Sequence, residues 1–168
     1  MIRPVAVVVG PPGAGKTTIG TALAQQLGRP FRDTDADIEE LAGKPIPEIF
    51  FDEGEEYFRT LEKNAVAAAL AEHGGVLALG GGAVLAPQTR EALRGHTVIY
   101  LSVELTDAVA RTGLSAARPL LAINPRATLK AMLDARRPLY EEVATIVVKT
   151  DGRTPEEITA ELVAALAQ

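Results

Sequence analysis

The most constraining feature of this chain is an eight-residue segment near its start, residues 10–17, which reads GPPGAGKT. The segment fits the spacing G-x-x-x-x-G-K-[ST]. It lies between a continuous apolar run over residues 5–9 and a helical pattern over residues 16–27. A buried strand followed by this loop and a helix is the context in which the motif binds phosphate groups. The pattern therefore predicts an α/β fold with a phosphate-binding loop after its first strand.

Each part of this loop has a predicted role in holding the tail of a nucleoside triphosphate. Glycines allow backbone N–H groups to turn inward around the phosphates, and the helix N-terminus adds partial positive charge. Lys16 is expected to reach the β- and γ-phosphates, and the Thr17 hydroxyl is expected to ligate Mg²⁺. The predicted nucleotide contacts come from the loop and the first turn of the helix: Gly13, Ala14, Gly15, Lys16, Thr17 and Thr18.

Short apolar runs alternate with helical segments along the rest of the chain. Helical patterns cover residues 16–27 and 55–72, and Asn124-Pro125 and Thr154-Pro155 mark two further helix starts. Such alternation predicts right-handed crossovers and a parallel sheet within a single domain. The predicted strands cover residues 5–9, 31–33, 76–79, 97–101 and 145–148.

Composition excludes several classes of protein. The net charge of −5 provides no broad positive surface for nucleic acid or an anionic membrane. The chain contains no cysteine, which excludes a disulfide framework, a thiolate nucleophile and a cysteine-based zinc site. No stretch approaches the roughly 18 apolar residues of a membrane span, and the short run over residues 5–9 lacks a signal-peptide pattern. We therefore expect a cytoplasmic protein.

The third predicted strand, residues 76–79, ends in three glycines, Gly80-Gly81-Gly82. In most proteins with this phosphate loop, an aspartate ends a second strand and helps to hold the metal. Here the carboxylate must come from elsewhere, and Asp33 at the end of residues 31–33 is the best candidate. The glycines could form a plain turn, but three in succession leave backbone N–H groups open to a ligand, and we favour that interpretation.

Two carboxylates follow the second predicted strand in the sequence Asp33-Thr34-Asp35. If strand geometry persists, their side chains point the same way, so that one could serve the metal and the other a substrate hydroxyl. The alternative is that Asp35 only caps a helix that begins near Ala36. Position alone does not separate these two interpretations.

A charged pair lies on the predicted helix over residues 55–72. Arg59 and Glu62 are three residues apart, a spacing at which side chains on one helix can interact. Taken by itself, such a spacing predicts a solvated surface ion pair that contributes little to stability.

Five motifs in order give the chain a clear resemblance. Residues 10–17, Asp33-Thr34-Asp35, Gly54-Glu55-x-x-Phe58-Arg59-x-x-Glu62, Leu79-Gly80-Gly81-Gly82 and Arg118-Pro119-Leu120-Leu121 together resemble the shikimate kinase family. Each motif after the first is weak alone, whereas all five in order are specific. The match is collinear to Tyr140 and continues less distinctively to the C-terminus. Arg32 departs from the pattern because the family usually has an apolar residue there, which favours a place at a sheet edge.

The resemblance implies a three-layer P-loop kinase fold: a central five-stranded parallel sheet flanked by helices, with a mobile lid. One domain is expected over residues 1–168, with a substrate-binding segment at about 34–62 and the lid at about 112–124. The implied activity is transfer of the ATP γ-phosphoryl group to the 3-hydroxyl of shikimate, on the pathway to chorismate and the aromatic amino acids. Mg²⁺ is the implied cofactor, and ATP and shikimate are the implied partners of a monomer that binds neither nucleic acid nor membrane.

The resemblance also implies an acceptor site. Asp35 binds the acceptor's hydroxyls, either as a general base or as an orienting group, and Arg59 pairs with the substrate carboxylate. A second arginine assists Arg59 in binding the carboxylate, and spacing alone does not decide between Arg136 and Arg137. Arg136 is chosen because the family's arginine lies two residues before the proline. The remaining implied substrate contacts are backbone N–H groups of Gly80, Gly81 and Gly82.

Three further arginines are implied to contact ATP. Arg118 belongs to the lid and meets the transferring phosphoryl group, so that it joins Lys16 and Asp35 as a catalytic residue. Arg111 lies against the adenine, and Arg153 lies near it on the last loop.

Two alternatives remain: another small-acceptor kinase, such as a gluconate or nucleoside monophosphate kinase, and a catalytically idle nucleotide-binding module.

Overall fold

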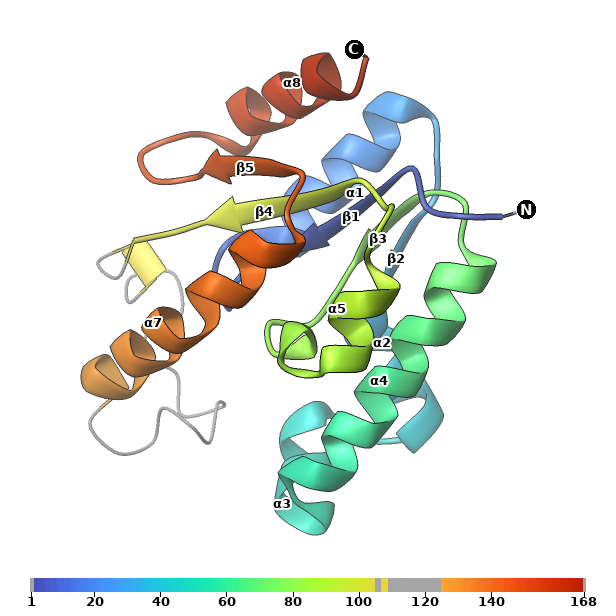
Figure 1. Cartoon of the computed structure of the whole chain (residues 1–168), viewed down its shortest axis with the longest axis vertical. Coiled ribbons are helices and arrows are strands. Elements are labelled where there is room, and N and C mark those ends of the chain that lie inside the picture. The colour runs from blue at the N-terminus through green and yellow to red at the C-terminus, as the bar shows by residue number, and fades with distance from the viewer. Residues whose placement is uncertain (1, 105–106, 109–124, 168) are drawn as a thin grey trace.

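The computed structural model describes residues 2–104, 107–108 and 125–167. Five parallel strands form one sheet in the order β2-β3-β1-β4-β5 (Figure 1). The predicted parallel sheet is confirmed, and each strand lies within one residue of its predicted bounds. The strands are β1 (Ala6–Val9), β2 (Phe31–Asp33), β3 (Val76–Ala78), β4 (Val98–Ser102) and β5 (Ile146–Lys149).

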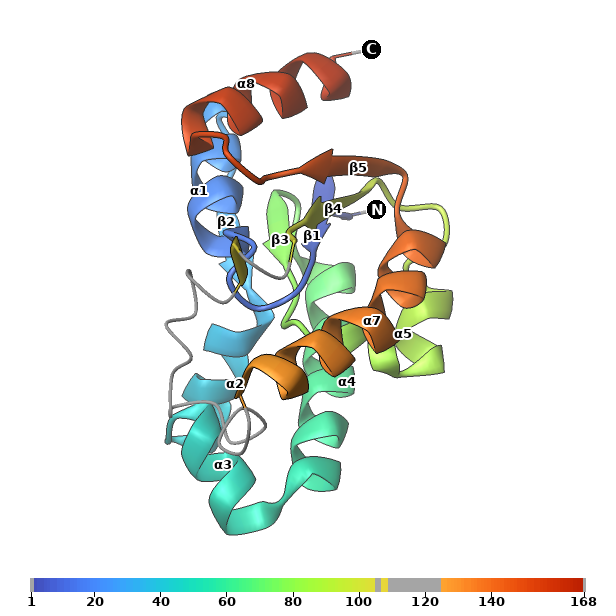
Figure 2. The same ribbon diagram turned by 90° about the vertical axis from the view of Figure 1, so that its left-hand side faces the viewer.

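The sheet is covered by helices on both faces, which makes three layers (Figure 2). Along β1, Ala6 and Val8 face a core with α1 (Lys16–Leu27) and α8 (Pro155–Leu166). Val7 and Val9 face the opposite core, with α4 (Glu55–Glu72), the second half of α7 (Pro125–Val143) and Leu93, which follows α5 (Pro87–Ala92). All four side chains are buried, as expected for a central parallel strand.

Predicted helix boundaries agree well where capping signals are present. Helices α1 and α4 have the predicted bounds, and α8 begins after Thr154, whose hydroxyl accepts a hydrogen bond from the Glu157 N–H at 3.2 Å. Helix α7 begins at the predicted Pro125, whereas Asn124 lies outside the described residues. Helix α2 (Thr34–Ala42) lies where a helix from near Ala36 is one of the two interpretations, whereas α3 (Ile46–Glu53), α5 and the short 3₁₀ helix η1 (Ala83–Leu85) are not predicted.

The strand order brings the predicted functional segments together. Strand β3 lies between β2 and β1, and all three run parallel. The phosphate loop follows β1, Asp33 ends β2, and the three glycines follow β3. Carboxyl ends of parallel strands meet at one edge of the sheet, which is where ligands of open α/β sheets bind. Helices α2, α3 and the first half of α4 extend beyond that edge (Figure 1).

A membrane-spanning helix is not found within residues 2–104, 107–108 and 125–167.

Candidate active site

The phosphate loop joins β1 to α1 in a conformation that needs glycine. Gly13 and Gly15 have φ of 82° and 92°, in the left-handed region that other residues rarely adopt. Helix α1 has no side-chain cap, so the N–H groups of its first turn face out toward the loop. The Lys16 ammonium donates to the carbonyls of Gly10 and Pro11 at 2.8 and 3.0 Å. Its positive charge therefore lies across the mouth of the loop, beside these N–H groups.

Asp33 connects this loop to the next strand. The Thr17 hydroxyl donates to Asp33 Oδ2 at 3.4 Å, while Asp33 Oδ1 accepts from the Asp35 N–H at 2.9 Å. One carboxylate oxygen is thus fixed as the cap of α2, and the other is turned toward Thr17. A hydroxyl and a carboxylate oxygen side by side are hard oxygen ligands suited to Mg²⁺.

Two expectations for the pair Asp33 and Asp35 are wrong. Helix α2 begins at Thr34 and not near Ala36, and its cap is Asp33 rather than Asp35. The strand does not continue past Asp33, so the two carboxylates do not point the same way: Asp33 faces Thr17, whereas Asp35 faces Gly80. The reason is that the Asp33 carboxylate accepts a hydrogen bond from the Asp35 N–H and so caps a helix that begins at Thr34.

The three glycines make room for charged side chains. A Cβ atom at Gly80 would overlap Asp35 Oδ1 and would lie 2.9 Å from Glu62 Oε2. A Cβ atom at Gly82 would lie 2.6 Å from Nη2 and 2.7 Å from Cζ of Arg59. The run therefore passes directly against the carboxylate of Asp35 and the guanidinium of Arg59, and neither position tolerates a side chain without displacing one of them.

The same glycines have open N–H groups. Gly80 and Gly82 accept hydrogen bonds through their carbonyls, from the N–H groups of Ala83 and Leu85 at 3.1 and 3.0 Å. None of the three glycine N–H groups donates to an acceptor in the part of the chain that the structure describes. Buried backbone donors are almost always paired, so N–H groups left open here indicate a place for a ligand.

Arg59 and Glu62 form a pair in which Glu62 is buried and Arg59 is half-buried, which corrects the expectation of a solvated surface pair. Arg59 Nη1 lies 2.7 Å from Glu62 Oε1, and the Glu62 side chain is only 4% exposed. Burial raises the pKa of Glu62, and the charges of Arg59 and Arg136 oppose that rise. The Arg59 guanidinium also stands 5.3 Å from the ring centre of Phe58, which further fixes its position.

Of the two adjacent arginines on α7, Arg136 faces this cluster. Arg136 is 7% exposed, and its charge acts on Glu62 and on the Tyr140 hydroxyl. Arg137 is exposed and acts instead on Tyr100, on the β4 side of α7. The arrangement agrees with the choice of Arg136, whose contact with substrate stays a prediction.

The remaining predicted nucleotide contacts lie at the margin of the structure or outside it. The Arg153 guanidinium contacts the Lys149 carbonyl at 3.2 Å and Glu161 at 3.1 Å, on the side of β5 and α8. Arg111, Arg118 and the predicted lid at about 112–124 lie outside the described residues. Arg32 lies on the edge strand β2, as expected, and pairs with Asp37 at 2.7 Å and with Glu72 at 3.2 Å.

A model of the shikimate kinase family matches residues 12–167. The chain belongs to the shikimate kinase family. A shikimate kinase from Salinispora arenicola is 70% identical over 166 residues, which cover 99% of each chain. One from Streptomyces coelicolor is 61% identical, covering 95% of this chain and 93% of its own.

Solved structures extend the comparison to the fold. Shikimate kinase from Acinetobacter baumannii in complex with shikimate has a TM-score of 0.93 and 37% identity, covering 99% of this chain and 94% of that chain. A gluconokinase from Sinorhizobium meliloti has a TM-score of 0.58 at 22% identity, which shows a shared fold alone. The predicted P-loop kinase fold and the predicted family are therefore confirmed.

The shikimate kinase motifs did not reveal two residues of this cluster in their observed roles. The spacing of Glu62 from Arg59 predicts only a surface ion pair, and no motif assigns a role to Tyr140. The Tyr140 hydroxyl donates to the Gly81 carbonyl at 2.5 Å. A signal was available, because Tyr140 follows Arg136 by four residues and so shares its helix face.

Proposed function

We propose that this chain is a shikimate kinase that transfers the ATP γ-phosphoryl group to the 3-hydroxyl of shikimate. The observation that carries the proposal is the glycine run after β3, which lies against Asp35 and Arg59 and leaves its N–H groups open. The glycine run also lies close to the phosphate loop, because a Cβ atom at Gly81 would lie 3.1 Å from Pro12 Cδ. The proposed acceptor site would therefore adjoin the proposed donor site.

The donor half is proposed to bind ATP through the phosphate loop. Backbone N–H groups of residues 13–18 and the Lys16 ammonium would surround the β- and γ-phosphates. Thr17 and Asp33 fit Mg²⁺, since they supply a hydroxyl and a carboxylate oxygen 3.4 Å apart. Mg²⁺ is commonly held by one or two protein oxygens together with phosphates and water, so a larger cluster of acidic ligands is not required. When bound, the ion neutralises phosphate charge.

The acceptor half is proposed to recognise a small hydroxy acid by charge and shape. Arg59 and Arg136 present two guanidinium groups, which match a carboxylate in bidentate geometry. Asp35 would accept hydrogen bonds from adjacent hydroxyls, and the open glycine N–H groups would donate to the substrate's oxygens. Glu62 pairs with Arg59 at 2.7 Å and so holds the guanidinium in place before substrate arrives.

The chemical step is a direct displacement at phosphorus. The 3-oxygen of shikimate forms a bond to the γ-phosphorus while the bond to the bridging oxygen of ADP breaks. The hydroxyl proton passes to Asp35, or to solvent if Asp35 only orients the hydroxyl. Such transfer depends mainly on positioning and charge neutralisation, which Lys16 would supply together with a Mg²⁺ ion held by Thr17 and Asp33. Arg118 is proposed to add positive charge at the transferring group.

Other features of the account are also proposals. We propose one domain over residues 1–168, with an acceptor segment at about 34–62, a lid at about 112–124, and nucleotide contacts from Arg111 and Arg153. We further propose that the enzyme is a cytoplasmic monomer without nucleic-acid or membrane partners. An idle nucleotide-binding module is disfavoured, because the chemical groups of Lys16, Thr17, Asp33 and Asp35 are all present.

An acceptor panel tests the proposal. ADP release from ATP and Mg²⁺ is followed with shikimate, gluconate or AMP added in turn, and with no acceptor as the baseline. We expect strong stimulation by shikimate alone. Stimulation by gluconate or AMP in its place would assign another acceptor, and a response to none of the three would favour the idle module.

A further inference from the structure

We propose that Tyr140 is a positioning residue for the acceptor site, whose hydroxyl fixes the peptide group that joins Gly81 to Gly82. The inference rests on the proposed function, because it concerns the same site. The observation that carries it is a hydrogen bond: the Tyr140 hydroxyl donates to the Gly81 carbonyl at 2.5 Å, across 59 residues of sequence. The contact joins α7 to the run that follows β3.

The geometry of a peptide bond explains why a contact to a carbonyl can position a donor. The Gly81 carbonyl and the Gly82 N–H belong to one planar trans peptide group and point in opposite directions. A hydrogen bond that holds the carbonyl on one side therefore sets the direction of the N–H on the other. That Gly82 N–H has no acceptor among the described residues, and a Cβ atom on Gly82 would lie 2.7 Å from Arg59 Cζ.

A restraint of this kind is needed because glycine is the most flexible residue. Three glycines in succession would sample many orientations of their peptide groups, and each would present the N–H groups differently. Bonds from Ala83 and Leu85 hold the carbonyls of Gly80 and Gly82, at 3.1 and 3.0 Å. The carbonyl between them is held by Tyr140 alone among the described contacts, so this side chain completes the set.

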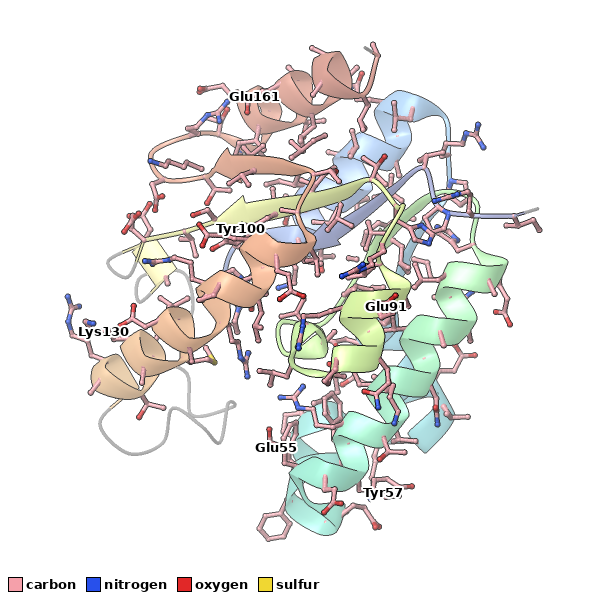
Figure 3. All side chains as sticks on the ribbon, viewed as in Figure 1. Glu55, Tyr57, Glu91, Tyr100, Lys130 and Glu161 are labelled. Carbon is pink, nitrogen blue, oxygen red and sulfur yellow. The ribbon has the colours of Figure 1, made fainter. Side chains whose placement is uncertain are left out.

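Tyr140 is itself held firmly enough to act as an anchor. It is 1% exposed, and its ring stacks on Tyr100 with centres 5.0 Å apart. Figure 3 labels Tyr100 on β4, next to α7. Burial raises the pKa of Tyr140 to about 12 despite the opposing charge of Arg136, so the hydroxyl remains a donor at neutral pH. Tyr140 and Arg136 lie about one helical turn apart on α7, and their side chains interact.

The test compares Tyr140→Phe with the matched control Tyr100→Phe. Both variants lose one hydroxyl and keep a buried ring, but the Tyr100 hydroxyl lies near Ser102 and Arg137, away from the glycines. We expect Tyr140→Phe to raise the KM for shikimate about fivefold or more, with the KM for ATP changed less than about twofold. Tyr100→Phe should leave both constants within about twofold. Wild-type activity with shikimate is measured first, so that its absence would count against the proposed function instead.

Two outcomes would overturn the positioning role. One is a KM for shikimate in Tyr140→Phe that stays within about twofold of wild type; the other is an equal rise in both KM values, which indicates a structural role. A measurement on the wild-type protein needs no variant to fold. The Tyr140 hydroxyl proton should give a slowly exchanging NMR resonance with contacts to Gly81 and Gly82, and failure to find these contacts would refute the hydrogen bond.

Discussion

A methyl group added at Gly82 gives the sharpest test of the acceptor geometry. In Gly82→Ala the new Cβ atom would stand 2.6 Å from Arg59 Nη2 and 2.7 Å from Cζ. Ordinary carbon contacts lie near 3.5–4.0 Å, so the guanidinium must move by about 1 Å. It can do so, because it is the end of a flexible side chain. The backbone at Gly82 has φ −99° and ψ 4°, which alanine can adopt.

The expected consequence is a loss of shikimate use without a loss of fold. Displacement of a positioning group by about 1 Å can lower a rate by about 100-fold, so we expect kcat/KM for shikimate to fall by roughly 10- to 100-fold. ATP binding should change by less than about twofold, since the contact lies on the acceptor side. The melting temperature should fall by only about 3 °C, which corresponds to a cost of about 1 kcal/mol in a domain of this size.

Steady-state kinetics with each substrate varied in turn provide the assay. Gly74→Ala is the matched control, because its Cβ atom would meet only Ile2 Cγ2 at 3.7 Å. That variant should behave as wild type with both substrates. If Gly82→Ala kept its kcat/KM for shikimate within about twofold, or lost ATP binding to the same degree, the placement of Arg59 as a substrate ligand would be refuted.

Three further changes test other parts of the site. Arg59→Ala should lower kcat/KM for shikimate by about 100-fold or more and leave ATP affinity unchanged in separate titrations; equal losses would make Arg59 structural. Asp33→Asn keeps a cap for α2 but removes the negative charge, so the Mg²⁺ concentration that gives the half-maximal rate should rise several-fold. If that concentration did not change, the role of Asp33 as a metal ligand would be contradicted. Burial raises the pKa of Glu62, so the folded protein holds a proton on Glu62 more tightly than the unfolded chain does. Protonation of Glu62 therefore adds to the free energy of unfolding at low pH, and this contribution is lost as the pH rises. The melting temperature of wild type minus that of Glu62→Gln should therefore increase as pH falls from about 7 to about 4.5, and a constant difference would contradict this reasoning.

Features encoded over a few residues were predictable from the sequence. The phosphate loop, the bounds of α1 and α4 and the start of α8 follow from local signals, namely glycine spacing, capping residues and apolar periodicity. The parallel sheet followed from alternation of strands and helices. Asp33 shows where a local signal was assigned to the wrong residue, because either aspartate could cap a helix and only the structure shows that α2 begins at Thr34.

Features that depend on tertiary packing could not be predicted in the same way. The spacing of Arg59 and Glu62 predicts an ion pair, but burial of Glu62 depends on the glycine run and on α7, which are distant in sequence. The contact of Tyr140 with Gly81 spans 59 residues and has no local signature. Arg136 and Arg137 differ only in the direction that α7 gives them. In each case the deciding neighbour comes from another element of the fold.

The central claim is that the glycine run sets a small hydroxy acid beside the phosphate loop for phosphoryl transfer. The most direct measurement incubates the full chain with γ-labelled ATP, Mg²⁺ and shikimate, and locates the phosphate by phosphorus–proton NMR correlation. The account predicts a single labelled product that carries the phosphoryl group on the 3-oxygen, with one molecule of product formed for each molecule of ADP. Label recovered only as inorganic phosphate, or on another oxygen of the ring, would contradict it.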